Sequence, residues 1–422
     1  MHLSTSSSSA SNSHGSRPHL SPAASWAVLR PFLVIVVGMV ATLLVLGEVV
    51  TRLAGWNYPS FSQSDPDRGW AQRPGAKGIF RDENKIGVFI QMSKDGLRDV
   101  DHALAKPAGT FRIALLGNSY SEALHVPLEQ TFWRVAGQEV EKCRPNGLDK
   151  VEMINFGVGG YGTAQELITL QKHVWKYSPD LILVGFLTGN DVYYNYRALV
   201  GHAGEPYYVY KNDRLELDDS FKRNLKLGRM KKIQQQVEDK VQLAGAVIHL
   251  RNEIKQWMFT GMQKLKASKN TVMNESEKTN TLQPTDFVYV PPKDGDWAEA
   301  WKVTEGILRL MKQEVASHNV PLVISTLSNS PQVNPDLKVR EEFMRQLGVN
   351  TLFYPDERIR LFGEREGIPV VTIAPGMAEL AQKENIFLHG FPGNMGKGHW
   401  NQTGNRVAGE AIGAGICKAL SK

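Results

Sequence analysis

The sequence has 422 residues, of which 42% are hydrophobic, with 9 Trp and a formal net charge of +6 at pH 7. This composition predicts a globular core rather than a disordered chain. The modest charge and the lack of zinc-finger or RNA-binding motifs argue against a nucleic-acid partner. Cys143 and Cys417 are too few for a disulfide scaffold and lack metal-ligand spacing. We expect no metal and no cofactor.

The N-terminal 50 residues have the pattern of a tail followed by a membrane anchor. Residues 1–25 are rich in Ser, His and Pro and are predicted to be disordered. Residues 26–50 contain an uncharged run, Phe32 to Gly47, and with its apolar neighbours it reaches the roughly 20 residues that cross a bilayer. A cleaved signal peptide is the alternative, but the run is long for one and no A-x-A site follows it.

The basic residues beside this segment favour one orientation of the expected anchor. Arg17 and Arg30 precede the apolar run and Arg52 follows it, a slight bias toward a cytoplasmic N-terminus. We therefore expect a single-pass inner-membrane protein whose large domain faces the periplasm.

Residues 51–110 are rich in Gly, Pro and Asp and contain one strand-like run, GVFIQM. They are predicted to form a linker and a small β-rich lead-in. A different pattern starts at residue 111 and continues to residue 422. It consists of five short apolar runs separated by segments of helical type: FRIALLG, VEMINFG, LILVGFL, VPLVIST and IPVVTI.

Apolar strands that alternate with helices predict a parallel sheet that is covered on both faces. The expected fold is a three-layer α/β/α domain with a five-stranded parallel sheet in the flavodoxin-like order 2-1-3-4-5. An insertion at about 192–293 separates the third and fourth strands. It begins with a predicted hairpin around Asn212-Asp213 and continues in a basic, helical run. That run fits a solvated helix face, or alternatively a surface drawn to anionic lipid.

Several polar groups follow the ends of the predicted strands. Ser119 follows the first strand, a glycine-rich loop follows the second, Asn190 follows the third, and His399 precedes the last helix. Ligands bind outside the carboxyl ends of the strands in an open parallel sheet. Acyl transfer needs a nucleophile, a base and donors for the developing oxyanion, and these groups can supply them.

The same four segments resemble the sequence blocks of the SGNH hydrolases, also called GDSL-type esterases. The blocks read GNSYSE, NFGVGGYG, TGND and GHWN, and the resemblance covers roughly Arg112 to Leu420 apart from the insertion. The residues around the blocks, including GYGTAQEL and HWNQTGN, are similar to those of bacterial membrane-anchored members. The resemblance implies that Ser119 attacks an acyl ester and His399 accepts its proton. The N–H groups of Ser119 and Gly160 and the Asn190 side-chain amide would hold the oxyanion of an acyl-serine pathway.

Two positions depart from the family pattern. Asn118 stands where the usual block has an aspartate. The family's acid usually precedes the histidine by two or three positions, but Lys397 and Gly396 occupy these places. His399 therefore has no local carboxylate to orient it. Another acid, with Asp356 as one candidate, or a backbone carbonyl would have to do so.

Three functions remain open from the sequence. The leading hypothesis is a serine esterase that hydrolyses an acyl ester, acetyl above all, on an envelope glycan or lipid. The second is an O-acyltransferase that passes acetyl to a polysaccharide beside a membrane acyl-transport partner. The third is a non-catalytic glycan- or lipid-binding module, motivated by the missing acid.

The two cysteines are predicted to pair. Cys143 ends the helix after the first strand, and Cys417 lies near the end of the last helix. In the 2-1-3-4-5 order these helices share one face of the sheet and run the same way, so their ends should be close. A bridge requires Cα atoms roughly 4.4 to 6.8 Å apart.

Overall fold

In the computed structural model the described residues are 22–54, 60–143, 145–201, 204–224 and 282–421, with scattered positions between 237 and 258. The chain divides into two compact units, Met1–Trp56 and Asn57–Lys422. The predicted N-terminal tail up to residue 21 and most of the basic run of the insertion lie outside the described residues.

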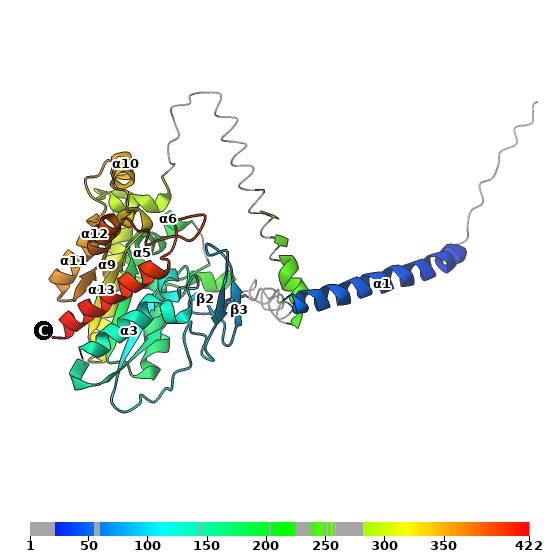
Figure 1. The fold of residues 1–422 in the computed structure, drawn as a ribbon, viewed down its shortest axis with the longest axis horizontal. Helices are drawn as coiled ribbons and strands as arrows, with labels where there is room; N and C mark the ends of the chain where they lie inside the picture. Colours follow the sequence, from blue (N-terminus) through cyan, green and yellow to red (C-terminus); the bar gives the residue numbers. More distant parts are fainter. Residues whose placement is uncertain are drawn as a thin grey trace, which may run out of the picture. The chain divides into compact units, whose positions relative to one another are not determined.

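The first unit contains one long helix, α1, at Pro22–Leu53 (Figure 1). Its part from Arg30 to Leu53 has a mean hydropathy of 2.7, and none of its most apolar window is buried. By length and composition this helix is able to cross a membrane, a test that an N-terminal signal sequence also passes. The helix starts at Pro22, so the last residues of the tail predicted for 1–25 are helical instead.

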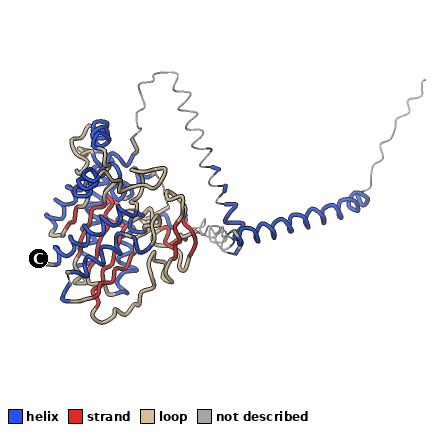
Figure 2. The backbone as a smooth tube through the Cα atoms, viewed as in Figure 1, coloured by secondary structure: helices blue, strands red, loops and turns tan. Residues whose placement is uncertain are grey.

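The second unit is built on a parallel sheet of five strands with the order β11-β10-β7-β5-β6, drawn as red strands in Figure 2. Numbered along the chain, this is the predicted order 2-1-3-4-5, so the predicted fold class is confirmed. The strands are β5 at Thr110–Gly117, β6 at Lys150–Asn155, β7 at Leu181–Leu187, β10 at Leu322–Leu327 and β11 at Val370–Thr372.

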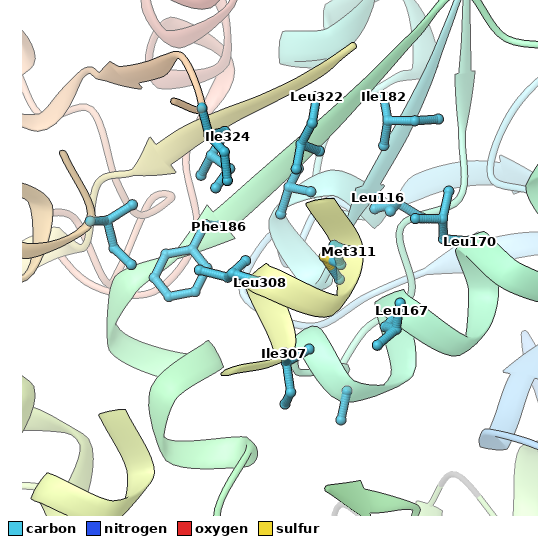
Figure 3. Packing of buried hydrophobic residues seen from close by; sticks show 14 of the residues in the cluster. Leu116, Leu167, Leu170, Ile182, Phe186, Ile307, Leu308, Met311, Leu322 and Ile324 are labelled. Atoms are coloured by element: carbon cyan, nitrogen blue, oxygen red, sulfur yellow. The ribbon is translucent and has the colours of Figure 1, made fainter. Parts of the chain in front are cut away.

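Each face of the sheet is covered by helices because the strands are apolar on both sides. On β5, Leu115 packs into one core cluster and its neighbour Leu116 into the other, as successive residues of a strand do. Figure 3 shows Leu116 with Leu167, Leu170 and Met311 in the cluster on the Leu116 side of the sheet. The helices are α3 at Phe132–Lys142, α12 at Ala374–Glu384 and α13 at Gln402–Leu420 on the Leu115 side; α4 at Thr163–Thr169, α9 at Gly295–Ser317 and α11 at Tyr354–Glu366 on the Leu116 side.

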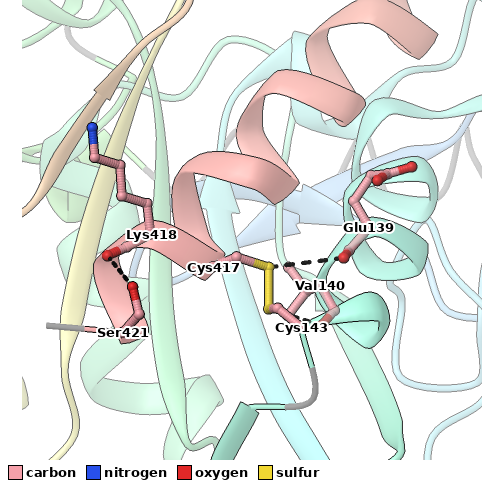
Figure 4. Close-up of a disulfide and its surroundings, with 6 residues drawn as sticks. All are labelled: Glu139, Val140, Cys143, Cys417, Lys418 and Ser421. Carbon is pink, nitrogen blue, oxygen red and sulfur yellow. Dashed lines mark hydrogen bonds between the residues drawn. A yellow bond between two sulfur atoms is a disulfide. The ribbon is translucent and has the colours of Figure 1, made fainter.

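Helices α3 and α13 lie side by side and are joined at their C-terminal ends (Figure 1). Cys143 and Cys417 form a disulfide with a Cα separation of 5.9 Å, shown in Figure 4. The predicted pairing is therefore confirmed, and its basis was the common direction of the two helices.

The lead-in, which is part of the second unit, folds into two hairpins. Its small core cluster includes Val88, Ile90 and Met92 together with Leu124, which follows the helix that begins at Ser119. The insertion contains the predicted hairpin, whose turn places Asn212 and Asp213 at positive φ. The strands are β1 at Ser62–Asp65, β2 at Gly69–Gln72, β3 at Lys77–Phe80, β4 at Val88–Gln91, β8 at Tyr207–Lys211 and β9 at Arg214–Asp218.

The second unit has further helices besides those that cover the sheet. They include α2 at Ser119–Glu122, α5 at Thr188–Tyr194, α6 at Arg197–Val200 and α10 at Leu337–Leu347. Because α2 and α5 follow β5 and β7 at the carboxyl edge of the sheet, they carry Ser119 and Asn190 to the same edge.

Candidate active site

Ser119 is the first residue of the one-turn helix α2, directly after β5. Asn118 caps this turn, since its side-chain oxygen accepts the N–H of Tyr120 at 3.1 Å. The helix ends at Ala123, whose φ of 50° is left-handed. Gly117 must be a glycine, because a Cβ there would lie 2.1 Å from the hydroxyl oxygen of Ser121. The sharp turn therefore fixes Ser119 at the sheet edge.

His399 reaches Ser119 across 280 residues of sequence. Its Nε2 lies 2.8 Å from the Ser119 Oγ. The imidazole contacts two rings: His125 stacks on it with centroids 4.1 Å apart and planes 18° apart, and the Tyr120 ring lies at 4.9 Å. The structure thus brings together the two side chains that the sequence predicted to meet.

Glu83 is the carboxylate that orients His399. Its Oε1 lies 2.8 Å from His399 Nδ1, and its Oε2 accepts the backbone N–H of His399 at 2.8 Å. It comes from the loop between β3 and β4 of the lead-in. Asp356, the candidate named from sequence, lies elsewhere: it is buried and accepts hydrogen bonds from Thr326 and Gln332.

The electrostatics of this group favour an ionised carboxylate. Burial acts to raise the pKa of Glu83, but the hydrogen bonds and charge of His399 outweigh it and hold the pKa below the ordinary value. Burial lowers the pKa of the neighbouring His125 despite the opposing effect of Asp82. A neutral His125 therefore stacks on His399, which leaves Glu83 as the charged group in contact with the imidazole.

The glycine directly before His399 makes room for Glu83, although the sequence alone does not show which side chain approaches it. Gly398 has a φ of 71°, and a Cβ on it would lie 2.1 Å from Glu83 Oε2. The missing side chain of Gly398 therefore leaves the space that the Glu83 carboxylate occupies. The prediction that residues 51–110 were only a linker and lead-in missed this contribution.

Three donors predicted for an oxyanion site have no acceptor among the described residues. Within Phe156–Gly162, where every residue is described, each backbone N–H except that of Gly160 donates to a protein acceptor. In the described part of the chain no acceptor faces the Ser119 N–H or the Asn190 side-chain amide. The glycine loop is next to the nucleophile, because a Cβ on Gly159 would lie 3.8 Å from the Ser119 Cβ.

Asn118 links the turn of Ser119 to the turn of Asn190. Its Nδ2 donates to Asp191 Oδ1 at 2.9 Å, and Asp191 Oδ2 accepts the N–H of Leu187 at 2.7 Å. Burial raises the pKa of Asp191 to about 8 against these two hydrogen bonds. An aspartate at position 118 would place a second buried carboxylate against Asp191, so asparagine suits this site better than the usual residue.

Glu166 is a second buried carboxyl near Asp191, and neither of its oxygens has a hydrogen-bond partner among the described residues. Burial and the nearby Asp191 raise its pKa well above 4.5. A carboxyl whose folded-state pKa is raised stabilises the fold below its unfolded pKa. This contribution is lost as the pH rises through the folded-state pKa.

We predict that Glu166→Gln flattens the dependence of the melting temperature on pH. The variant should melt close to the wild type near about pH 5 and above it near about pH 8, because the amide does not ionise. Thermal unfolding followed by circular dichroism across this range measures the effect. A wild type and variant that change in parallel with pH would show that Glu166 titrates normally.

Among the described residues, one group near the nucleophile has the composition of a metal site: Glu83, His125 and His399, with ligand atoms within 4.8 Å of one another. The two imidazoles are stacked, so their in-plane lone pairs run side by side instead of converging on one ion. The geometry fits a carboxylate–imidazole pair, with His125 as a ring that packs on it.

The sequence matches no protein-family profile and no curated protein. Solved structures that are similar include the acetyl xylan esterase AlAXEase, with 12% identity and a TM-score of 0.36 over 72% of this chain and 100% of that chain. A lipolytic protein of the G-D-S-L family from Desulfitobacterium hafniense has 10% identity and a TM-score of 0.33 over 72% and 98%. A two-domain esterase active on acetylated mannans has 10% identity and a TM-score of 0.33 over 74% and 50%.

Matches at this level of similarity carry no argument about the activity of this chain, and the case for one rests on the geometry of the site. In its blocks and in the order of its sheet, the chain resembles the SGNH hydrolases.

Proposed function

We propose that this protein is a serine esterase that works through an acyl-serine intermediate. The observation that carries the proposal is the continuous chain of Ser119, His399 and Glu83, with two contacts of 2.8 Å that involve the two different ring nitrogens of His399. A nucleophile, a base and a group that orients the base form the arrangement that activates a serine.

Each residue has one role in the proposed reaction. Ser119 Oγ attacks the ester carbonyl while His399 Nε2 takes its proton, and the carbonyl electrons move to the oxygen. His399 then returns the proton to the departing alkoxide, which leaves the acyl group on Ser119. A water molecule, deprotonated by His399, attacks this ester and releases the carboxylic acid and free Ser119.

The negative oxygen of the tetrahedral intermediate needs donors that are already in place. The N–H groups of Ser119 and Gly160 and the amide of Asn190 are assigned to it, because none of the three has an acceptor among the described residues. Each such donor typically contributes on the order of 3 kcal/mol to lowering the barrier.

Glu83 removes the motivation for the non-catalytic alternative. That hypothesis rested on the lack of an acid beside His399, and Glu83 supplies two contacts to the same residue. The carboxylate selects the tautomer with the proton on Nδ1, so that Nε2 can accept the proton of Ser119.

The surroundings of the site support a short acyl group on a large substrate. The side chains of His399 and Glu83 are 24% and 19% exposed, so an ester on a bulky molecule can reach them. The cavity that borders Ser119 and His399 is small, about 10 Å³, so this part of the described site has no room for a long acyl chain. We propose an acetyl ester of an extracytoplasmic glycan or lipid; the apolar helix α1 and the disulfide support such a location.

The test is hydrolysis of an aryl acetate by the full-length protein in detergent, compared with Ser119→Ala. The wild type should release acetate into water and react with a fluorophosphonate, and the variant should do neither. Ser121→Ala, which alters another hydroxyl of the same turn, should retain both reactions. Equal turnover by the Ser119→Ala variant would refute the proposal.

A further inference from the structure

We propose that Trp70, a residue of the lead-in strand β2, is a positioning residue that aims the Gly160 N–H at the reacting carbonyl oxygen. This inference rests on the proposed esterase function and extends it. It makes the lead-in a part of the oxyanion site as well as the source of Glu83.

The argument starts from the peptide group between Gly159 and Gly160. The indole N–H of Trp70 donates to the carbonyl oxygen of Gly159 at 3.0 Å. A peptide group is planar, and in the trans form its C=O and its N–H point in opposite directions. The bond from Trp70 to the carbonyl oxygen therefore also fixes the direction of the Gly160 N–H, which lies in the same plane and points away from Trp70.

A second contact fixes the adjacent peptide group. Glu122, on the helix that begins with Ser119, accepts the N–H of Gly159 at 2.9 Å through Oε2. Its other oxygen accepts from the side chain of Gln72, which also donates to the Gly157 oxygen at 2.9 Å. Gly159 is thus held on one side by Trp70 and on the other by Glu122, and the nucleophile and the loop are tied together.

Trp70 itself is held rigidly. Its ring packs against Tyr161 at 5.7 Å, and the Tyr161 hydroxyl donates to the Trp70 carbonyl oxygen. Gln165 donates to the carbonyl oxygen of Arg68 at 3.0 Å, which fastens the same hairpin to α4. A Cβ on Gly160 would lie 3.2 Å from the Trp70 ring, and the φ of 81° there also favours glycine.

We expect this arrangement to stabilise the transition state rather than the bound substrate. An oxyanion donor acts mainly on the charge that develops as the tetrahedral intermediate forms, so a donor that points away lowers kcat and leaves substrate binding largely unchanged. A residue that merely stabilised the fold would instead lower the melting temperature or the active fraction.

The test compares Trp70→Phe with Trp175→Phe in the full-length protein. Both changes remove an indole hydrogen bond, since Trp175 donates to Glu314 at 2.9 Å on the surface of the α4–α9 layer. We expect Trp70→Phe to lower kcat by about 10- to 30-fold with KM within about 2-fold, less than the loss of a whole donor. It should slow fluorophosphonate labelling by a similar factor. Trp175→Phe should keep both values within about 2-fold.

A folded Trp70→Phe variant with wild-type kcat, or one whose loss is all in KM, would overturn the inference. If circular dichroism shows that Trp70→Phe does not fold, Glu122→Gln is the second variant. Its amide must turn an NH₂ group toward either Gly159 or Gln72, which are both donors, so we expect the same loss of kcat with unchanged KM. Wild-type kcat in that folded variant would likewise refute the inference. An inactive Ser119→Ala beside a fully active Trp70→Phe defeats only the positioning role, whereas an active Ser119→Ala defeats the esterase itself.

Discussion

Glu83→Gln is expected to lower kcat by about 10³- to 10⁴-fold while KM changes little, as in other triads whose acid becomes an amide. The reason lies in the two contacts of the carboxylate. Both His399 Nδ1 and the His399 backbone N–H face Glu83 oxygens, and in the active tautomer both are donors. Glutamine has one acceptor oxygen, so its NH₂ group must face one of them. When it faces Nδ1, the ring proton moves to Nε2, which can no longer accept the proton of Ser119.

Asp82→Asn is the matched control for this prediction. Asp82 is the adjacent carboxylate on the same loop; its side chain is 62% exposed, and it lies 3.8 Å from His125 and makes no hydrogen bond to His399 among the described residues. We expect it to retain kcat within about 3-fold, as surface substitutions away from a site usually do. Steady-state kinetics on an aryl acetate gives both values. A folded Glu83→Gln enzyme that is as fast as the wild type would show that another group orients His399.

Removal of the disulfide is expected to lower the free energy of unfolding by about 2 to 5 kcal/mol. Cys143 and Cys417 are 274 positions apart, so the bridge closes a loop that includes almost the entire parallel sheet. In the chain-entropy account, the loss comes from the larger freedom of the unfolded chain. The expected loss is a large share of the total free energy of unfolding of an ordinary domain, about 5–15 kcal/mol.

The double variant Cys143→Ser, Cys417→Ser should nevertheless retain kcat. Cys417 lies 15 positions after Gln402, the first residue of α13, which is roughly 22 Å along the helix at 1.5 Å per residue. Urea unfolding of the second unit, residues 57–422, measures the change. A reducing agent should destabilise the wild type by the same amount and leave the variant unaffected. An unchanged urea midpoint in the variant would contradict the prediction.

The fold and half of the site were predictable because their signals are local. Each strand is a continuous apolar run, and Ser119, Gly160 and Asn190 each follow a strand end, where the parallel order of the sheet brings them to one edge. His399 could be placed because it precedes the last helix. The cysteine pairing followed from the common direction of two helices on one face.

Glu83 and Trp70 could not be predicted in the same way. Glu83 contacts a residue 316 positions away, and Trp70 contacts one 89 positions away. Both come from short hairpins whose strands have four residues each, too short to show how they dock. Gly160 and Gly398 have positive φ values and lie at these contacts, but a glycine in the sequence does not say which side chain approaches it.

The central claim is that Ser119, activated by His399 and Glu83, forms the covalent bond to the acyl group. The most direct measurement is mass spectrometry of peptides from wild-type protein that has been labelled with a fluorophosphonate. We expect the label on the peptide containing Ser119, with fast labelling in Asp82→Asn and slow labelling in Glu83→Gln. A label on any other residue, or labelling that persists in Ser119→Ala, would contradict the account.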